Sequence, residues 1–144
     1  MVNVLQAMIL TDGPKILLTP TYHVYKMYVP FQGAKLVPVS FDAGTYAFGD
    51  IRLPKVDAVA ARDRSGRLWV ALVNVDPNRA ARLAMDGASA RSAVGEVLTG
   101  GAVDAHNSFE QPALVAPRPF AGRRSAAGLQ FDLPAKSVAV VELR

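Results

Sequence analysis

From Gly33 onward, turn signals interrupt the sequence about every ten residues, and short apolar runs fill the spaces between them. The turns lie at 62–67, 74–78, 86–87 and 133–136, where Asp, Asn, Gly and Pro gather. This pattern predicts strands at Lys35–Phe41, Val56–Arg62, Arg67–Asn74, Arg79–Met85, Ala90–Leu98, Gly128–Leu133 and Ser137–Leu143. Short strands at this spacing are typical of a mainly β fold, an antiparallel β-sandwich of the jelly-roll kind.

The composition agrees with one globular domain and excludes several kinds of site. Of 144 residues, 51% are hydrophobic, which is too many for a disordered chain, and 11 Gly with 10 Pro are too many for a helical bundle. The absence of cysteine excludes disulfides, thiolate zinc sites and a cysteine nucleophile. Two histidines, His23 and His106, are too few for a histidine-built metal cluster. We therefore expect no metal and no other cofactor.

The first thirty residues follow a different pattern. Apolar residues at 4, 5, 8 and 9 share one helix face, which predicts the last turns of a helix that ends at 12–14. The apolar run Lys15–Pro20 predicts a strand buried on both faces, as in parallel sheets. A second helix, capped by Thr21 and ended by Pro30, follows it. Helix, strand and helix form a piece of a β/α repeat.

A single parallel strand has no neighbour for its backbone hydrogen bonds, so this piece is incomplete by itself. Either it packs on the remaining domain in an unusual way, or it is the end of a larger α/β domain, and we favour the second interpretation. The predicted division is therefore residues 1–32, the end of such a domain, and residues 33–144, the β-sandwich.

Four residues are candidates for a functional site. Tyr22 and His23 follow the end of the predicted buried strand, where α/β barrels place their active-site loops, although a tyrosine-faced packing helix explains them as well. His106 and Glu110 lie in a long Gly, Ala and Pro-rich insert at 99–124, and a carboxylate close to a histidine can tune its pKa. The simpler interpretation is a network that folds the loop. Trp69 lies among apolar neighbours and is expected in the core.

Other chemistries find little support. The Asp residues fall mainly at strand ends and in turns, where Asp bonds the backbone, so a catalytic carboxylate pair within the chain is not expected. The cluster of Arg118, Arg123 and Arg124 has one aromatic beside it, which indicates a solvated basic loop and no nucleic-acid partner. No apolar run approaches the ~18 residues of a membrane span, and no basic residue precedes the apolar start as in a signal peptide. We expect a soluble chain.

Three stretches of the sequence resemble a known family. They are the run 2–13 (VNVLQAMILTDG), the run 17–28 (LLTPTYHVYKMY) and the loop 106–112 (HNSFEQP). In these stretches the chain resembles the α-L-arabinofuranosidases of glycoside hydrolase family 51. The likeness spans nearly all of this chain and the last third or less of a family member.

The resemblance implies a (β/α)8 barrel followed by a jelly-roll-like β-sandwich. Residues 1–32 would be the end of the seventh helix, the eighth strand and the eighth helix, and residues 33–144 the sandwich. Family members cleave terminal non-reducing α-L-arabinofuranosyl units from arabinan or arabinoxylan with retention of configuration. Their two catalytic glutamates, at the ends of the fourth and seventh strands, would lie upstream of Met1, and a glutamine that contacts the arabinose would fall at, or just before, the start of this chain. No catalytic residue of the family is assigned to this sequence.

On this interpretation the chain is a non-catalytic C-terminal fragment, and arabinose-containing oligosaccharides are ligands of the complete enzyme. The resemblance further implies a homo-oligomer and a cytoplasmic location. Two alternatives stay open. One is an independent β-sandwich module for carbohydrate binding or oligomerisation, and the other is a small enzyme that uses His106 and Glu110.

Overall fold

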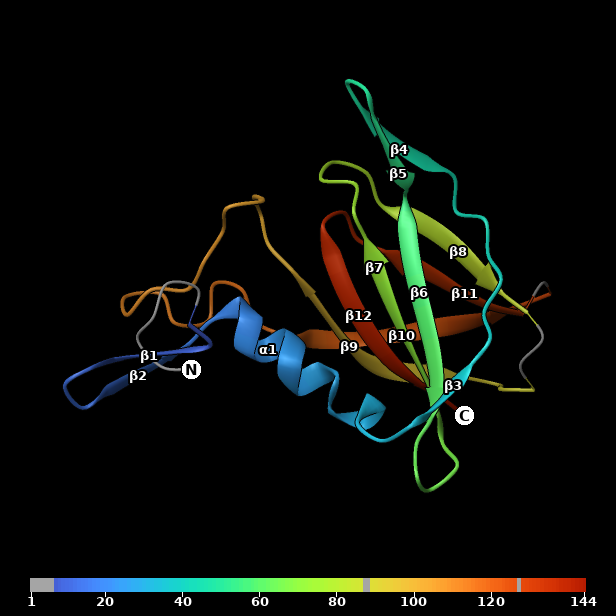
Figure 1. The fold of residues 1–144 in the computed structure, drawn as a ribbon, viewed down its shortest axis with the longest axis horizontal. Coiled ribbons are helices and arrows are strands. Elements are labelled where there is room, and N and C mark those ends of the chain that lie inside the picture. Colours follow the sequence, from blue (N-terminus) through green and yellow to red (C-terminus); the bar gives the residue numbers. More distant parts are fainter. Residues whose placement is uncertain (1–6, 87–88, 127) are drawn as a thin grey trace.

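A computed structural model describes residues 7–86, 89–126 and 128–144 (Figure 1). These residues form one α-helix, α1 (Pro20–Met27), one 3-10 turn, η1 (Val29–Phe31), and strands β1 (Ile9–Asp12), β2 (Lys15–Leu18), β3 (Lys35–Val37), β4 (Thr45–Phe48), β5 (Ile51–Pro54), β6 (Val56–Arg62), β7 (Leu68–Asn74), β8 (Ala81–Met85), β9 (Ala93–Thr99), β10 (Arg118–Ser125), β11 (Gly128–Leu133) and β12 (Ser137–Leu143). The predicted mainly β fold is confirmed. The bounds of β6, β11 and β12 match the predicted ones, and β3 is shorter than predicted.

The main sheet has eight strands in the order β3-β6-β7-β12-β9-β10-β11-β8, and the strand pairs along it are antiparallel. The sheet curls, so that β8 and β11 lie behind β6 and β7 as the second layer of a sandwich (Figure 1). The strand β12 lies between β7 and β9 and pairs with both over its full length.

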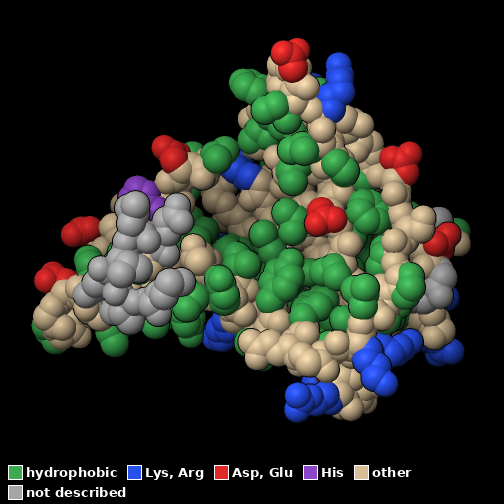
Figure 2. Space-filling view, in the orientation of Figure 1, with side chains coloured by type: hydrophobic (Ala, Val, Ile, Leu, Met, Phe, Trp, Pro, Cys, Tyr) green, Lys and Arg blue, Asp and Glu red, His purple; other side chains and the backbone are tan. Residues whose placement is uncertain are grey.

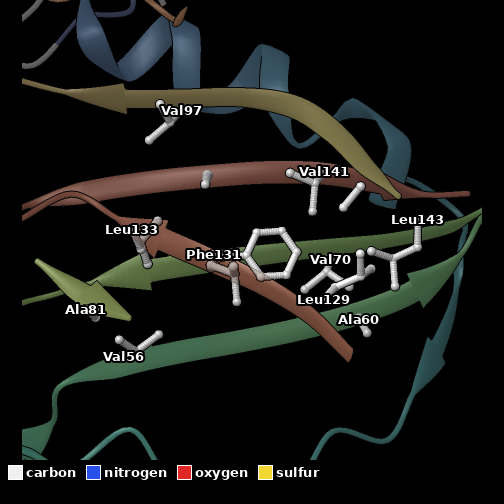
Figure 3. Close-up of a cluster of buried hydrophobic side chains, with 13 residues drawn as sticks. Val56, Ala60, Val70, Ala81, Val97, Leu129, Phe131, Leu133, Val141 and Leu143 are labelled. Atoms are coloured by element: carbon white, nitrogen blue, oxygen red, sulfur yellow. The ribbon is translucent and has the colours of Figure 1, made fainter. Parts of the chain in front are cut away.

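The main hydrophobic core fills the inside of the curled sheet (Figure 3). Alternate residues of each strand point inward, as expected for a sheet with one buried face. Phe131 on β11 is 1% exposed and stacks on Phe120 of β10, with 6.1 Å between ring centroids. The core therefore joins the two layers through an aromatic pair.

Strand β10 was predicted as a solvated basic loop, and this prediction is wrong. Its first half, Arg118–Gly122, pairs with β9, and its second half, Arg123–Ser125, pairs with β11. Each half bonds a neighbour on one side only, which is why Pro119, without an N–H, is tolerated in the strand. The strand passes from one layer to the other at Gly122, where an added Cβ would lie 2.7 Å from the Phe131 ring. The arginines are exposed, as predicted, but they stand on a strand.

The N-terminal elements also differ from the prediction. Residues 4 and 5 of the predicted first helix lie outside the described residues, and Ile9 belongs to strand β1. β1 pairs antiparallel with β2 as a two-stranded hairpin, so β2 is not a parallel strand, and its first two residues, Lys15 and Ile16, are exposed. The helix α1 is capped by Thr19 and not by Thr21, because the Thr19 side chain accepts from the Tyr22 N–H.

Helix α1 packs on the outer face of the main sheet through a second cluster of apolar residues. Met27 is buried there with Ala71, Leu98, Val115 and Val140, and several half-buried residues, among them Val24, Tyr28, Phe31 and Trp69, surround them. The N-terminal segment and the sheet therefore share a core. Trp69 is half-buried, as a packing residue, and its indole N–H donates to the Asp63 carboxylate at 3.1 Å.

Strands β4 and β5, which the sequence did not predict, form an arm that projects from the sandwich (Figure 1). The register pairs Tyr46 with Leu53 and Phe48 with Ile51, so these four side chains share one face. Phe48 is 71% and Ile51 56% exposed. The opposite face carries Thr45, Ala47, Arg52 and Pro54.

Candidate functional site at the amino-terminal hairpin

The four predicted site residues lie at one junction of the fold. Tyr22 and His23 occupy the first turn of α1, directly after the β1–β2 hairpin, and His106 and Glu110 lie in the loop 100–117 between β9 and β10. This loop contacts the end of β2, because the Asn107 side chain donates to the Leu18 carbonyl. The hairpin, the start of α1 and the loop are therefore one unit at one end of the molecule.

Tyr22 and His23 contact each other. Their ring centroids are 5.5 Å apart with an interplanar angle of 77°, an edge-to-face arrangement. Burial lowers the pKa of His23 below its ordinary value, and the nearby Lys26 lowers it further, while Glu96 acts in the opposite direction. The imidazole is therefore held neutral to lower pH than a free histidine and could accept a proton at neutral pH.

His106 and Glu110 are not brought together. The His106 ring Nδ1 lies 3.0 Å from the Asp104 carbonyl, so this ring bonds within its own loop. Glu110 bonds the Ser108 hydroxyl, which lowers the pKa of the carboxyl, and the Lys15 ammonium adds a smaller effect in the same direction. Both side chains are exposed, and no hydrogen bond joins them within the described residues. This geometry fits a network that folds the loop and does not support an acid/base pair.

Asn107, between these two residues, is the buried polar side chain that holds the loop. It is 5% exposed, its Nδ2 donates to the carbonyls of Leu18 (2.9 Å) and Val115 (3.0 Å), and its Oδ1 accepts from the Val115 N–H at 2.7 Å. Sequence reasoning passed over Asn107, because an asparagine in a loop is usually a turn residue. The only sequence feature that drew attention to this position was the surrounding polar run HNSFEQP.

Two hollows open elsewhere on the surface. The larger, of about 950 Å³, lies between the free edges β3 and β8 of the curled sheet, and its lining includes Phe41, Leu83, Met85 and Phe131. Figure 2 shows hydrophobic side chains gathered over this central hollow. The smaller, of about 470 Å³, lies at the base of the arm, beside Arg52 and Pro54. No glutamate lines either hollow.

The carboxylates whose pKa is most perturbed serve turns. Asp63 accepts from Ser65, Arg67 and Trp69, and these bonds hold its pKa far below the ordinary range, against the opposing effect of burial. The backbone N–H of Asn78 is the main cause of the lowered pKa of Asp76. Neither carboxylate lines a hollow. Among the residues that the structure describes, no three His, Cys, Asp or Glu side chains gather as metal ligands, and no helix is long and apolar enough to cross a membrane.

The fold is a curled antiparallel sandwich that shares a core with an N-terminal helix. The sequence profile of the family described as "Alpha-L-arabinofuranosidase C-terminal domain" matches residues 1–137. The chain belongs to this family, and the resemblance seen in the sequence is confirmed.

Solved and curated relatives agree. The chain is similar to the GH51 arabinofuranosidase of Xanthomonas axonopodis pv. citri, with 39% identity and a TM-score of 0.93 over 100% of this chain and 30% of that one. It is 38% identical to the intracellular exo-alpha-L-arabinofuranosidase of Bacteroides ovatus, over 99% of this chain and 29% of that protein. A thermostable GH51 enzyme of Thermotoga petrophila shares the fold at 24% identity and a TM-score of 0.80, over 100% of this chain and 32% of that one. The chain thus spans about 30% of the length of these relatives.

Proposed function

We propose that this chain is the C-terminal part of an enzyme that hydrolyses terminal α-L-arabinofuranosyl units of arabinan or arabinoxylan with retention of configuration, and that the chain itself is not catalytic. The observation that carries the proposal is the 39% identity to a GH51 arabinofuranosidase over the whole of this chain, in a matching fold. The arrangement of the carboxylates supports the second part. The chain has three glutamates, of which Glu110 bonds Ser108 and Glu142 pairs with Arg144 at 2.9 Å.

We assign residues 1–32 to the end of a catalytic barrel and residues 33–144 to the β-sandwich. In a (β/α)8 barrel each strand is parallel to the next and is followed by a helix. The antiparallel hairpin β1–β2 cannot supply such a strand, and only Thr19 separates it from α1. The hairpin is therefore best placed in the connection between the last barrel strand and its helix, which is α1. Connections of this type line the active-site face of barrels.

This placement gives a role to the predicted residues Tyr22 and His23. They begin the helix that follows the proposed active-site connection, so they lie close to the substrate face of the complete enzyme, as wall residues and not as catalytic ones. His106 and Glu110 stabilise the loop beneath the hairpin.

We further propose a homo-oligomer in the cytoplasm. The apolar face of the β4–β5 arm supports the first part, because a two-stranded hairpin with an exposed apolar face is poorly stable in water unless it packs on something. The Bacteroides ovatus relative, an intracellular exo-alpha-L-arabinofuranosidase, supports the second. The same arm is the observation in favour of the alternative, an independent module for oligomerisation.

The test is an assay with an aryl α-L-arabinofuranoside on two proteins, the 144-residue chain and the longer polypeptide in which it occurs. The longer polypeptide should release the aryl group and the chain should not. Turnover by the chain alone that disappears on Glu110→Gln substitution would refute the non-catalytic assignment, and an inactive longer polypeptide would refute the activity.

A further inference from the structure

We propose that Asn107 is a positioning residue: through it, the loop 100–117 of the β-sandwich clamps the β1–β2 hairpin and so fixes one connection of the active-site face. The inference rests on the proposed function for the identity of that face, and on the structure for the clamp itself. Its elements are two polar side chains, Asn107 and Thr19, that bond the backbone of segments far apart in the sequence.

The first link joins the sandwich to the hairpin. Asn107 is 89 residues from Leu18, whose carbonyl accepts from its Nδ2 at 2.9 Å. The remaining Nδ2 hydrogen and the Oδ1 atom are both bonded to Val115, so both N–H groups and the oxygen of the amide are in use. A buried amide with these partners has one orientation, because any rotation would leave donors and acceptors unpaired in an apolar setting. Leu18 is therefore held at a fixed distance from the loop.

The second link joins the end of the hairpin to its beginning. The Thr19 hydroxyl lies 2.9 Å from the Ala7 carbonyl and 3.0 Å from the Met8 carbonyl, and the Thr19 N–H donates to Met8 at 3.0 Å. Thr19 also caps α1. Residues 7 and 8, where the chain enters the hairpin, are thus tied to the residue that follows Leu18. The loop 100–117 therefore fixes Leu18 directly, and Thr19, the next residue, fixes the start of the hairpin at residues 7 and 8.

The residues that the two links join are shielded from solvent. Leu17 is 2% exposed, Ala7 3% and Val115 5%, although the hairpin is a separate two-stranded sheet. A hairpin of four-residue strands has little stability of its own. The clamp and the burial of Leu17 therefore give the hairpin its fixed position, and a displacement of about 1 Å in an active-site element can cost up to about 100-fold in rate.

The first experiment is hydrogen exchange on the 144-residue chain with the substitution Asn107→Asp. The carboxylate keeps the acceptor for the Val115 N–H and loses the two donors, so exchange should rise at least tenfold for the amides of residues 9–19 and stay low at Val115. Gln111→Glu makes the same chemical change on an exposed residue of the same loop, and it should leave the exchange of residues 9–19 and of Val115 unchanged. Unchanged exchange of the hairpin in a folded Asn107→Asp variant would overturn the clamp.

The second experiment measures kcat/KM of the longer polypeptide at 25 °C, well below unfolding, with the same two substitutions and with Thr19→Val and Thr19→Ser. Asn107→Asp and Thr19→Val should lower kcat/KM about tenfold or more, while Thr19→Ser, which keeps the hydroxyl, and Gln111→Glu should retain it. A lower Tm with unchanged kcat/KM means that Asn107 is merely structural and overturns the positioning role. An inactive wild-type polypeptide refutes the proposed function instead, and the exchange result then still decides the clamp.

Discussion

Replacing Gly122 by alanine should destabilise the sandwich through one identifiable contact. The added Cβ would lie 2.7 Å and 2.8 Å from two atoms of the Phe131 ring and 3.2 Å from the Ala93 Cβ. Because Phe131 is 1% exposed and stacks on Phe120, the ring can move away from the new Cβ only by disturbing this aromatic pair and the core around it. Overpacking of this kind costs about 1–3 kcal/mol. The smaller backbone entropy of alanine in the unfolded chain returns about 0.4–1 kcal/mol.

The midpoints of these two ranges give an expected net loss of about 1.3 kcal/mol, or about 4 °C in Tm for a chain of this length. The assay is thermal and urea unfolding of a double-mutant cycle with Phe131→Leu. The smaller side chain opens space for the new methyl group, so Gly122→Ala should cost less than about 0.5 kcal/mol in that background. The matched control is Gly101→Ala, since a Cβ there meets nothing within 4 Å. Additive effects in the cycle, or a Gly122→Ala chain as stable as the Gly101→Ala control, would refute the contact as the cause.

Three further predictions concern charge and exposure. Asp76 has a pKa lowered by the backbone N–H of Asn78, so its stabilising effect is present above the unfolded value of about 3.9 and is lost as the pH falls through the lower folded value. Tm should therefore drop in acid, and Asp76→Asn, less stable at pH 7, should drop less in the same scan. The pKa of His23 is also lowered in the folded chain, here mainly by burial. The unfolded chain again takes up the proton first, so stability should decline as the pH falls through about 6.5, and His23→Gln should remove this decline in unfolding curves. The Phe48 side chain is 71% exposed, so Phe48→Ser should change the free energy of unfolding by less than about 0.5 kcal/mol. The same substitution should reduce the binding of a hydrophobic dye and the molecular mass measured by light scattering. A large loss of stability would instead show that the arm packs on its own chain.

The strands that the sequence predicted well share a simple pattern. β6, β11 and β12 each border a clear turn and place alternate residues in the main core, so local chemistry and the final environment agree. β10 was missed because Pro119 and Gly122 read as loop residues. What makes them fit is the change of partner from β9 to β11, which is a property of the whole sheet and not of eight residues. The arm was missed for a related reason, since its two short strands are mostly exposed and do not show the buried apolar runs that predict strands.

The sequence pointed to the loop at 106–112 but not to the residue that makes its buried bonds. The insert around residues 106–112 was interpreted mainly as a network that folds the loop, and in the structure its Asn107 bonds the end of β2 at Leu18. The residue type that attracted attention was His106, because histidine titrates near neutral pH, whereas Asn107 makes the buried bonds. Its partner Leu18 accepts through its backbone carbonyl, a group that every residue has. No sequence pattern could therefore predict the contact between Asn107 and Leu18. The antiparallel register of β1 and β2 was likewise hidden, because apolar residues at 4, 5, 8 and 9 fit a helix equally well.

The place of β12 at the centre of the sheet has a consequence for how the protein is made. The ribosome completes β7 at Asn74 but reaches the first residue of β12, Ser137, only roughly 3–13 seconds later at common elongation rates. During that interval β7, and β9 once Thr99 has been added, expose an unpaired edge of hydrogen-bonding groups to other chains in the cell. The sandwich is therefore assembled largely after its own strands have been synthesised, and nascent chains of this domain should be clients of chaperones that shield strand edges until β12 arrives.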